Sequence, residues 1–170
     1  MAGRPNLAAL SSLPVTSFNG SVYRIVTERL REKILSTEGN RFYPGRYHLQ
    51  GETGILYTSL DEKVAIEELT RHAARPTLKV KLAAGQIHLR LQNVLDLTSA
   101  PSLRKLGLSK EDLISADYLI PQSISLQARK MGLQGLIVPS ATSAGQNLII
   151  FENNFGEGCL IEVETIRPLD

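Results

Sequence analysis

The sequence predicts an α+β fold, in which short helices pack against a curved or split, mostly antiparallel sheet. Its 170 residues are 42% apolar, which suits one domain with a core of its own. Six or seven segments read as strands, and four or five short segments carry helix start or stop signals. The helical segments separate the early strands and then cluster. This irregular order favours α+β over a regular alternation of strands and helices.

The chain begins with a segment that we interpret as an N-terminal arm at residues 1–17, followed by a single domain at residues 18–170. Asn19-Gly20 is typical of a turn. Residues 21–27 then alternate like a strand, with Arg24 on the same face as two valines. An arginine there either reaches the sheet edge or points into a pocket. Residues 28–38 are predicted to form a short helix.

The segment from Gly45 to Arg71 organises the rest of the chain. A loop rich in arginine, tyrosine and glycine leads into a short strand centred on Leu56 and then into a helix. Ser59 and Glu62 have the spacing of a capping box, which predicts the helix start. The loop is either a solvated surface or an anion site with tyrosines for stacking a flat ring.

Two adjacent glutamates on this helix differ in their surroundings. Glu67 lies between Lys63 and Arg71 at four-residue spacing, which is typical of a solvated face. Glu68 has Val64 one turn before it and therefore lies beside the apolar side. We expect Glu68, and not Glu67, to carry chemistry.

The remaining elements follow from periodicity and from turn residues. Ser109 is expected to cap one short helix, Pro121 to open another and Gly132 to end it. The predicted helices are 101–107, 109–116 and 121–131. The predicted strands are 77–82, 86–97, 135–139, 147–151 and 158–166.

Composition narrows the function classes. A net charge of +2, with no basic run interleaved with aromatics, gives no sign of direct nucleic-acid binding. Cys159 is the only cysteine, so no intramolecular disulfide forms, and no metal site is expected. No apolar run approaches the ~20 residues of a membrane span. The N-terminus does not resemble a secretion signal, so we expect a cytoplasmic protein.

No GxGxxG, Walker, HExxH or GxSxG motif is present. The polar residues that stand near strand ends suit a phosphate-bearing, sugar-containing ligand, with arginines for phosphate and a carboxylate for a glycosidic bond. These residues are Arg24, Arg46, Tyr57, Glu68 and Ser140.

The chain resembles the RES-domain family, which is named for its Arg, Glu and Ser. Order and spacing agree over about residues 20–155. The matching segments are YRI at Tyr23–Ile25, GRYHLQG at Gly45–Gly51, ILYTS at Ile55–Ser59, the helix segment VAIEEL, PQSISLQARKMGLQGLIVPSA at Pro121–Ala141 and NLIIFEN at Asn147–Asn153. The family's usual Arg-Trp-Asn is Arg46-Tyr47-His48 here, which keeps an aromatic but replaces an amide with an imidazole.

The resemblance implies an ADP-ribosyltransferase-like fold and an enzyme that uses NAD as substrate, without a separate cofactor. Arg24 and Arg46 would hold the pyrophosphate, and Tyr57 would orient the nicotinamide end, with Tyr47 also in the pocket. Glu68, eleven residues after Tyr57, would stabilise the cationic ribose. Ser140 would hydrogen-bond the ribose or a phosphate.

The family includes many toxins that deplete NAD, so the resemblance implies cleavage of the nicotinamide–ribose bond by water or phosphate. It also implies neutralisation by a cognate antitoxin, typically a helix-turn-helix protein. Two alternatives stay open: an ADP-ribosyltransferase that modifies a specific protein, and a non-catalytic nucleotide-binding or interaction module. The N-terminal arm is a candidate docking segment for a partner or for a second copy of the chain.

Overall fold

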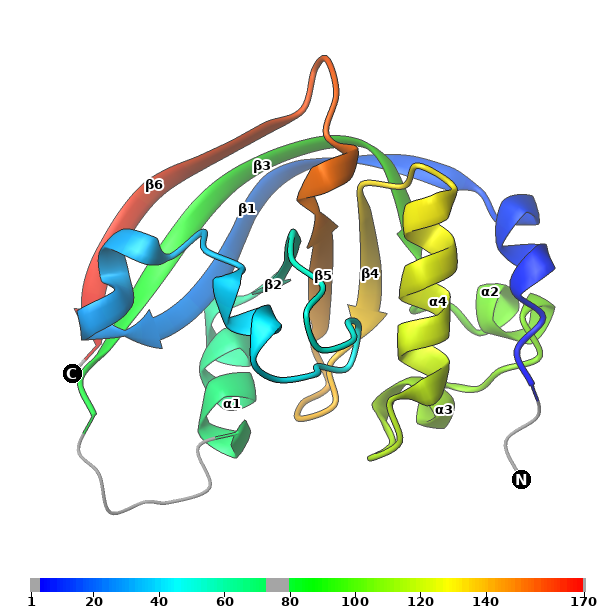
Figure 1. The fold of residues 1–170 in the computed structure, drawn as a ribbon, viewed down its shortest axis with the longest axis horizontal. Coiled ribbons are helices and arrows are strands. Elements are labelled where there is room, and N and C mark those ends of the chain that lie inside the picture. Colours follow the sequence, from blue (N-terminus) through cyan, green and yellow to red (C-terminus); the bar gives the residue numbers. More distant parts are fainter. Residues whose placement is uncertain (1–3, 73–79, 170) are drawn as a thin grey trace.

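The computed structural model describes residues 4–72 and 80–169, and in them one six-stranded sheet closes on itself (Figure 1). The order β1-β2-β5-β4-β3 returns to β1, because β3 also pairs with β1, and β6 extends the sheet beyond β3. The strands are β1 (Val15–Thr27), β2 (Ile55–Ser59), β3 (Leu82–Asp96), β4 (Gly135–Pro139), β5 (Gln146–Phe151) and β6 (Leu160–Leu169). The predicted α+β class is confirmed, and five strands form a closed barrel.

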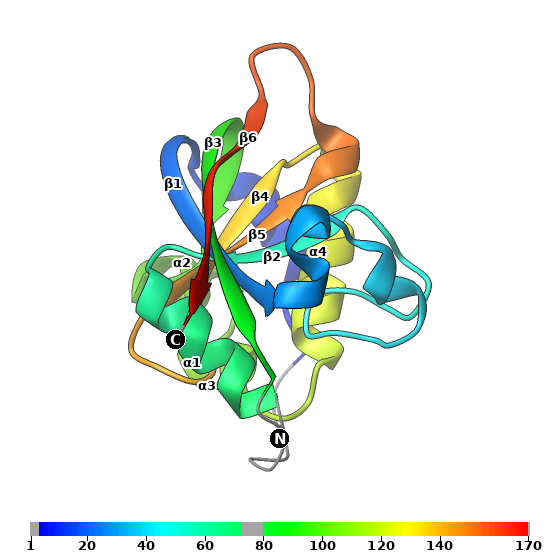
Figure 2. The same ribbon diagram turned by 90° about the vertical axis from the view of Figure 1, so that its left-hand side faces the viewer.

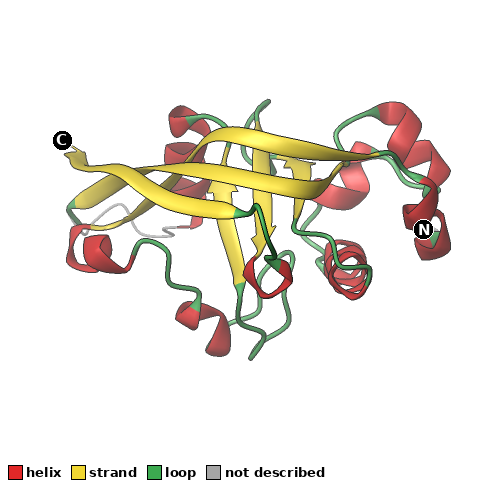
Figure 3. Ribbon diagram, turned by 90° about the horizontal axis from the view of Figure 1, so that it is seen from above, coloured by secondary structure: helices red, strands yellow, loops and turns green. Residues whose placement is uncertain are grey.

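Every pairing is antiparallel except that of β3 with β4. The long strands β1, β3 and β6 pass over the shorter β2, β5 and β4, as the view from above shows (Figure 3). The predicted turn at Asn19-Gly20 is wrong. Both residues lie inside β1 and pair with Arg90 and Leu89 of β3, so a long-range ladder overrides a local turn signal. Of the strand predicted at 77–82, residues 77–79 lie outside the described residues.

The helices are short: α1 (Glu62–His72), α2 (Ala100–Lys105), α3 (Lys110–Ile114) and α4 (Leu119–Lys130), with 3-10 turns at Leu7–Ser12, Glu28–Lys33, Glu38–Arg41 and Glu152–Asn154. The predicted cap of α3 is confirmed, because Ser109 and Asp112 form a capping box. The helix predicted at 28–38 is instead a 3-10 turn that ends at Lys33. The α4 helix begins two residues before Pro121, and Gly132 follows its end with φ +80°.

Two main hydrophobic clusters hold these layers together. One is formed by side chains of the barrel strands β1 to β5, among them Val22, Leu89 and Ile150. The other joins the sheet to α2, α3 and α4, and it includes Leu10 and Leu13 from the segment before β1. The 3-10 turn at Leu7–Ser12 therefore packs on the body of the protein.

Candidate active site

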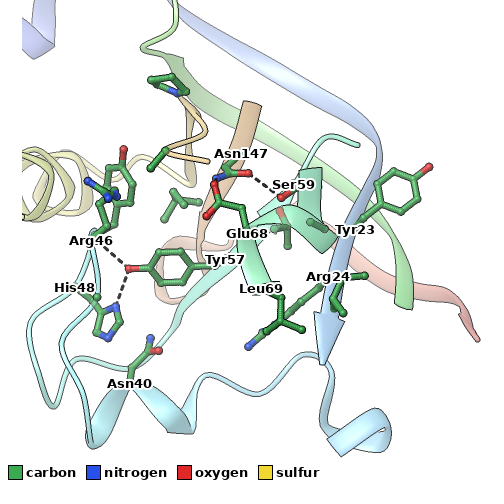
Figure 4. Close-up of a pocket in the computed structure, with 18 of the residues that line it drawn as sticks. Tyr23, Arg24, Asn40, Arg46, His48, Tyr57, Ser59, Glu68, Leu69 and Asn147 are labelled. Atoms are coloured by element: carbon green, nitrogen blue, oxygen red, sulfur yellow. Dashed lines mark hydrogen bonds between the residues drawn. The ribbon is translucent and has the colours of Figure 1, made fainter. Parts of the chain in front are cut away.

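One end of the candidate site lies at a row of residues that pair with one another across four strands of the sheet. Tyr23 of β1 pairs with Ser59 of β2, Ser59 pairs with Asn147 of β5, and Asn147 pairs with Val138 of β4. At this row β2 ends, β4 is about to end and β5 begins. Beside it opens a cavity of about 390 Å³, within the size range of small-molecule sites. Figure 4 shows its lining side chains.

Glu68 reaches this cavity from α1, and side chains from two other elements donate hydrogen bonds to it. The Ser140 hydroxyl donates to Glu68 Oε1 at 2.5 Å, and Asn147 Nδ2 donates to the same oxygen at 2.9 Å. The Ser59 hydroxyl donates to Asn147 Oδ1 at 2.7 Å, which fixes the orientation of the amide. The carboxylate is therefore oriented by a connected network from three strand ends, of which Figure 4 shows Ser59 and Asn147 beside Glu68.

Ser140 is almost fully buried, with 1% of its surface exposed. Its single proton is donated to Glu68, and its oxygen accepts hydrogen bonds from the backbone N–H groups of Thr142 and Ser143 at 3.1 and 3.2 Å. Ser140 therefore stands behind the carboxylate and contributes to its position, whereas Glu68 and Asn147 line the cavity.

The predicted capping box at Ser59 is wrong. Asp61 caps α1, because its carbonyl accepts from Ala65 N at 3.1 Å and its side chain accepts from Lys63 N at 2.8 Å. Ser59 is the last residue of β2, and its hydroxyl donates to Asn147 Oδ1 in the site instead of capping the helix. The helix nevertheless presents Glu68 to the cavity, as its apolar-side position predicted, because periodicity and not the start residue sets the face.

Tyr57 forms a wall of the cavity and is fixed at its hydroxyl. His48 Nε2 lies 2.9 Å from the carbonyl of Tyr43, which can only accept, so Nε2 carries the proton in the neutral ring. His48 Nδ1, 2.8 Å from the Tyr57 hydroxyl, then accepts its proton. The same hydroxyl accepts from Tyr47 N at 2.8 Å. Burial raises the pKa of the Tyr57 phenol far above its usual value.

Tyr47 borders the cavity but lies mostly in the core. It is 2% exposed, packs in the cluster that joins the sheet to the helices, and its hydroxyl is buried without a hydrogen-bond partner among the described residues. Burial also raises the pKa of its phenol strongly. The loop that carries Tyr47 lies beside α4 (Figure 2), where Gln122 Nε2 donates to the carbonyl of Gly45 at 2.9 Å.

Arg46 is fixed at the rim of the cavity by the turn between α3 and α4. Its Nη1 donates to the carbonyls of Leu113 and Ser115 at 3.1 and 2.5 Å. Its guanidinium carbon lies 4.6 Å from the centroid of the Tyr118 ring, in cation–π geometry. These contacts fix the orientation of the Arg46 guanidinium, so that its remaining N–H groups can donate to an anion in a defined direction.

Arg24 enters the cavity from β1 and differs from Arg46 in its partners. Its Nη1 is buried, and no atom of the described residues accepts a hydrogen bond from it. Burial lowers the pKa of Arg24 to about 10, against an opposing effect of the nearby Glu152 carboxylate. Glu152 itself has its pKa raised by burial. A buried guanidinium N–H without an acceptor is costly unless a bound group accepts its hydrogen bond.

The structure thus brings Arg24, Arg46, Tyr47, Tyr57 and Glu68 to one cavity, with Ser140 directly behind it. The sequence analysis missed three residues that complete the site: Ser59, Tyr118 and Asn147. Asn147 had one available signal, its position as the polar first residue of the otherwise apolar strand predicted at 147–151. Within residues 4–72 and 80–169, no group of three or more His, Cys, Asp or Glu side chains is placed to hold a metal. No helix in the same ranges is long and apolar enough to cross a membrane.

Comparison with known proteins identifies a family. The family model described as RES domain matches residues 21–167. The chain is 38% identical over 112 residues to a Mycobacterium tuberculosis (strain ATCC 25618 / H37Rv) protein named probable NAD(+) phosphorylase Rv3189. That match covers 64% of this chain and 53% of the relative, so the chain matches about half of the relative's length.

A solved structure shows the same fold. The crystal structure of the M. tuberculosis MbcT–MbcA toxin–antitoxin complex contains a chain with a TM-score of 0.80 to this one and 20% sequence identity. The superposition covers 96% of this chain and 91% of the other. It supports the α+β architecture of a five-stranded barrel with a few short helices.

Proposed function

Because this chain belongs to the RES domain family, we propose that it is a toxin-like enzyme that consumes NAD by cleaving the nicotinamide–ribose bond. The similarity to a protein named as a probable NAD(+) phosphorylase supports NAD as the substrate. NAD is then consumed and not recycled as a cofactor. We further propose that the barrel is related to the ADP-ribosyltransferase fold.

The observation that carries this proposal is the fixed carboxylate of Glu68 in a cavity that arginines border. Cleavage of the bond develops positive charge on the ribose, and a carboxylate held in place needs no reorganisation to stabilise it. At about 4 Å and an effective dielectric of ~20, the attraction is on the order of 4 kcal/mol, or roughly a 10³-fold change in rate.

The other side chains would have supporting roles. Ser140 and Asn147 position the carboxylate, since both hydrogen-bond the same oxygen. We do not assign Ser140 as a nucleophile, because it is almost fully buried and is not part of the cavity lining. The rings of Tyr57 and Tyr47 would border the nicotinamide end, and Arg46 would bind the pyrophosphate at the rim.

We also propose that a cognate antitoxin of the helix-turn-helix type covers this cavity. Tyr43 and Leu119 are 76% and 67% exposed, and each is the sequence neighbour of a cavity-lining residue, Pro44 or Tyr118. Exposed apolar side chains at the rim of a pocket are typical of a protein contact. Replacing Tyr43 and Leu119 with serine should weaken neutralisation by the antitoxin while NAD consumption by the free protein continues. Unchanged neutralisation would remove this surface from the proposal.

The test of the activity compares wild type, Glu68→Gln and the matched control Glu67→Gln in an NAD-consumption assay with and without phosphate. We expect loss of activity in Glu68→Gln only, with thermal unfolding unchanged in both variants. Dependence on phosphate would separate phosphorolysis from hydrolysis. Equal activity of wild type and Glu68→Gln would refute the role of the carboxylate.

Two other outcomes would replace the proposal. If labelled NAD transfers its label to a protein and little free ADP-ribose appears, the protein is an ADP-ribosyltransferase. If NAD binds tightly without turnover, it is a nucleotide-binding module.

A further inference from the structure

Four tyrosines border the cavity, and one of them differs from the others in its packing. Tyr47 lies in the cluster that joins the sheet to the helices, and Tyr57 packs against that cluster. Tyr23 packs against a smaller cluster between α1 and the sheet. Tyr118 is half-buried but takes part in none of the hydrophobic clusters of the described residues. Its ring is therefore an aromatic surface of the cavity that is not packed into the core.

Tyr118 lies at the mouth of the cavity, on the turn that also holds Arg46. The residues on either side of it, Asp117 and Leu119, are exposed. Two main-chain carbonyls from the end of α3 fix Arg46, whose guanidinium carbon lies 4.6 Å from the centroid of the Tyr118 ring. Because a guanidinium stacks on a single face of a ring, the opposite face of Tyr118 remains for a flat group.

The carboxylate of the site lies deeper than this turn. Ser140, which donates to Glu68 at 2.5 Å, is 1% exposed, so this side of the carboxylate faces the interior. If the nicotinamide–ribose bond lies at Glu68, the rest of the dinucleotide extends from there toward the mouth. With the pyrophosphate at Arg46, the next flat group along the substrate is the adenine base.

We propose that Tyr118 binds this adenine by stacking and makes the enzyme select a dinucleotide over a mononucleotide. The inference rests on the proposed function and adds a specificity-determining residue to it. Tyr118 then differs in role from Tyr57 and Tyr47, which border the nicotinamide end. Stacking of a base on an aromatic side chain changes affinity by roughly 5- to 150-fold.

Binding of the base can be measured apart from turnover, by calorimetric titration of the Glu68→Gln protein. Adding Tyr118→Ala should raise the dissociation constant of ADP about tenfold or more, and that of inorganic pyrophosphate, which has no base, about twofold or less. Adding Arg46→Gln should weaken the binding of both ligands. Tyr118→Phe keeps the ring and should leave ADP binding unchanged. The matched control is Tyr43→Ala, at an exposed tyrosine that does not line the cavity, and it should change neither constant.

Steady-state kinetics supply the second readout. NAD and nicotinamide mononucleotide contain the same nicotinamide–ribose bond, but only NAD contains adenine. Tyr118→Ala should raise KM for NAD about tenfold or more, with little change in kcat and with KM for the mononucleotide nearly unchanged. The preference of the enzyme for NAD, measured as the ratio of the two kcat/KM values, should fall by the same factor.

Three results would overturn the inference. The first is an equal rise in KM for both substrates in Tyr118→Ala, because the ring would then act only through Arg46. The others are ADP binding that Tyr118→Ala does not weaken, and a loss in Tyr118→Phe as large as that in Tyr118→Ala. If no variant consumes NAD but ADP binding still depends on the Tyr118 ring, the base site stands and the proposed activity fails.

Discussion

Removing one hydroxyl, in Tyr57→Phe, should destabilise the protein by much more than the loss of one hydrogen bond. The hydroxyl accepts from Tyr47 N and donates to His48 Nδ1, both at 2.8 Å. Tyr47 and His48 are only 2% and 5% exposed, so water does not readily replace the missing group. Each buried polar group left unsatisfied costs about 1–3 kcal/mol, so the two groups together should lower the free energy of unfolding by about 2–6 kcal/mol.

Urea denaturation measures this loss as a lower midpoint with an unchanged slope. The matched control is Tyr43→Phe, the same chemical change on a side chain that is 76% exposed, and it should stay within about 0.5 kcal/mol of wild type. In Tyr57→Phe we also expect weaker NAD binding, because the hydroxyl holds the loop that carries Arg46. If both tyrosine variants unfold at the same urea concentration, the hydroxyl does not hold this loop and the reasoning is refuted.

Three further predictions concern the same site. Gly45→Ala should lower the free energy of unfolding by about 1–3 kcal/mol, because a Cβ there would meet the His48 ring and the Tyr57 hydroxyl. The control Gly39→Ala, whose Cβ meets nothing within 4 Å, should be neutral. The midpoints of urea denaturation of the two variants measure the difference. Asn147→Ala should lower kcat by about 10–100-fold with a smaller effect on KM, since it removes a donor that positions the carboxylate; equal kcat would contradict this role. Tyr47→Phe should leave the rise in 295 nm absorbance between about pH 9 and 11 as large as in wild type, because burial raises the pKa of the Tyr47 phenol and this group does not ionise there. In wild type the folded state keeps a Tyr47 proton that the unfolded state loses, so the free energy of unfolding should fall as pH rises above about 10.

Local patterns predicted the elements whose structure depends on local chemistry. The cap of α3 at Ser109, the strand at Gly135–Pro139 and the glycine at the end of α4 all follow from short-range rules. The length of β1 does not follow from them, because Asn19-Gly20 is a strong turn signal and only its pairing with β3 keeps it extended. Closure of the sheet depends on that same pairing, which no local pattern contains.

In the candidate site, too, some features follow from local patterns and others only from long-range strand pairing. Helical periodicity separated Glu68 from Glu67, although the predicted cap was two residues too early, because the face of a residue depends on its spacing from its neighbours. Helical periodicity could not identify the side chains that donate hydrogen bonds to Glu68. Ser140 and Asn147 are 72 and 79 residues from it in the chain, and they meet it only through the register of three strands.

This register makes barrel closure a condition for the site. Tyr23↔Ser59 is the register pair that joins β1 to β2, and Ser59↔Asn147 continues the row into β5. A shift by one residue would turn each side chain of the shifted strand to the opposite face. The hydroxyl of Ser59 would then leave the Asn147 amide, and Arg24 would leave the cavity. The pairing that joins β1 to β2 therefore links the fold directly to the position of the carboxylate and of the buried arginine.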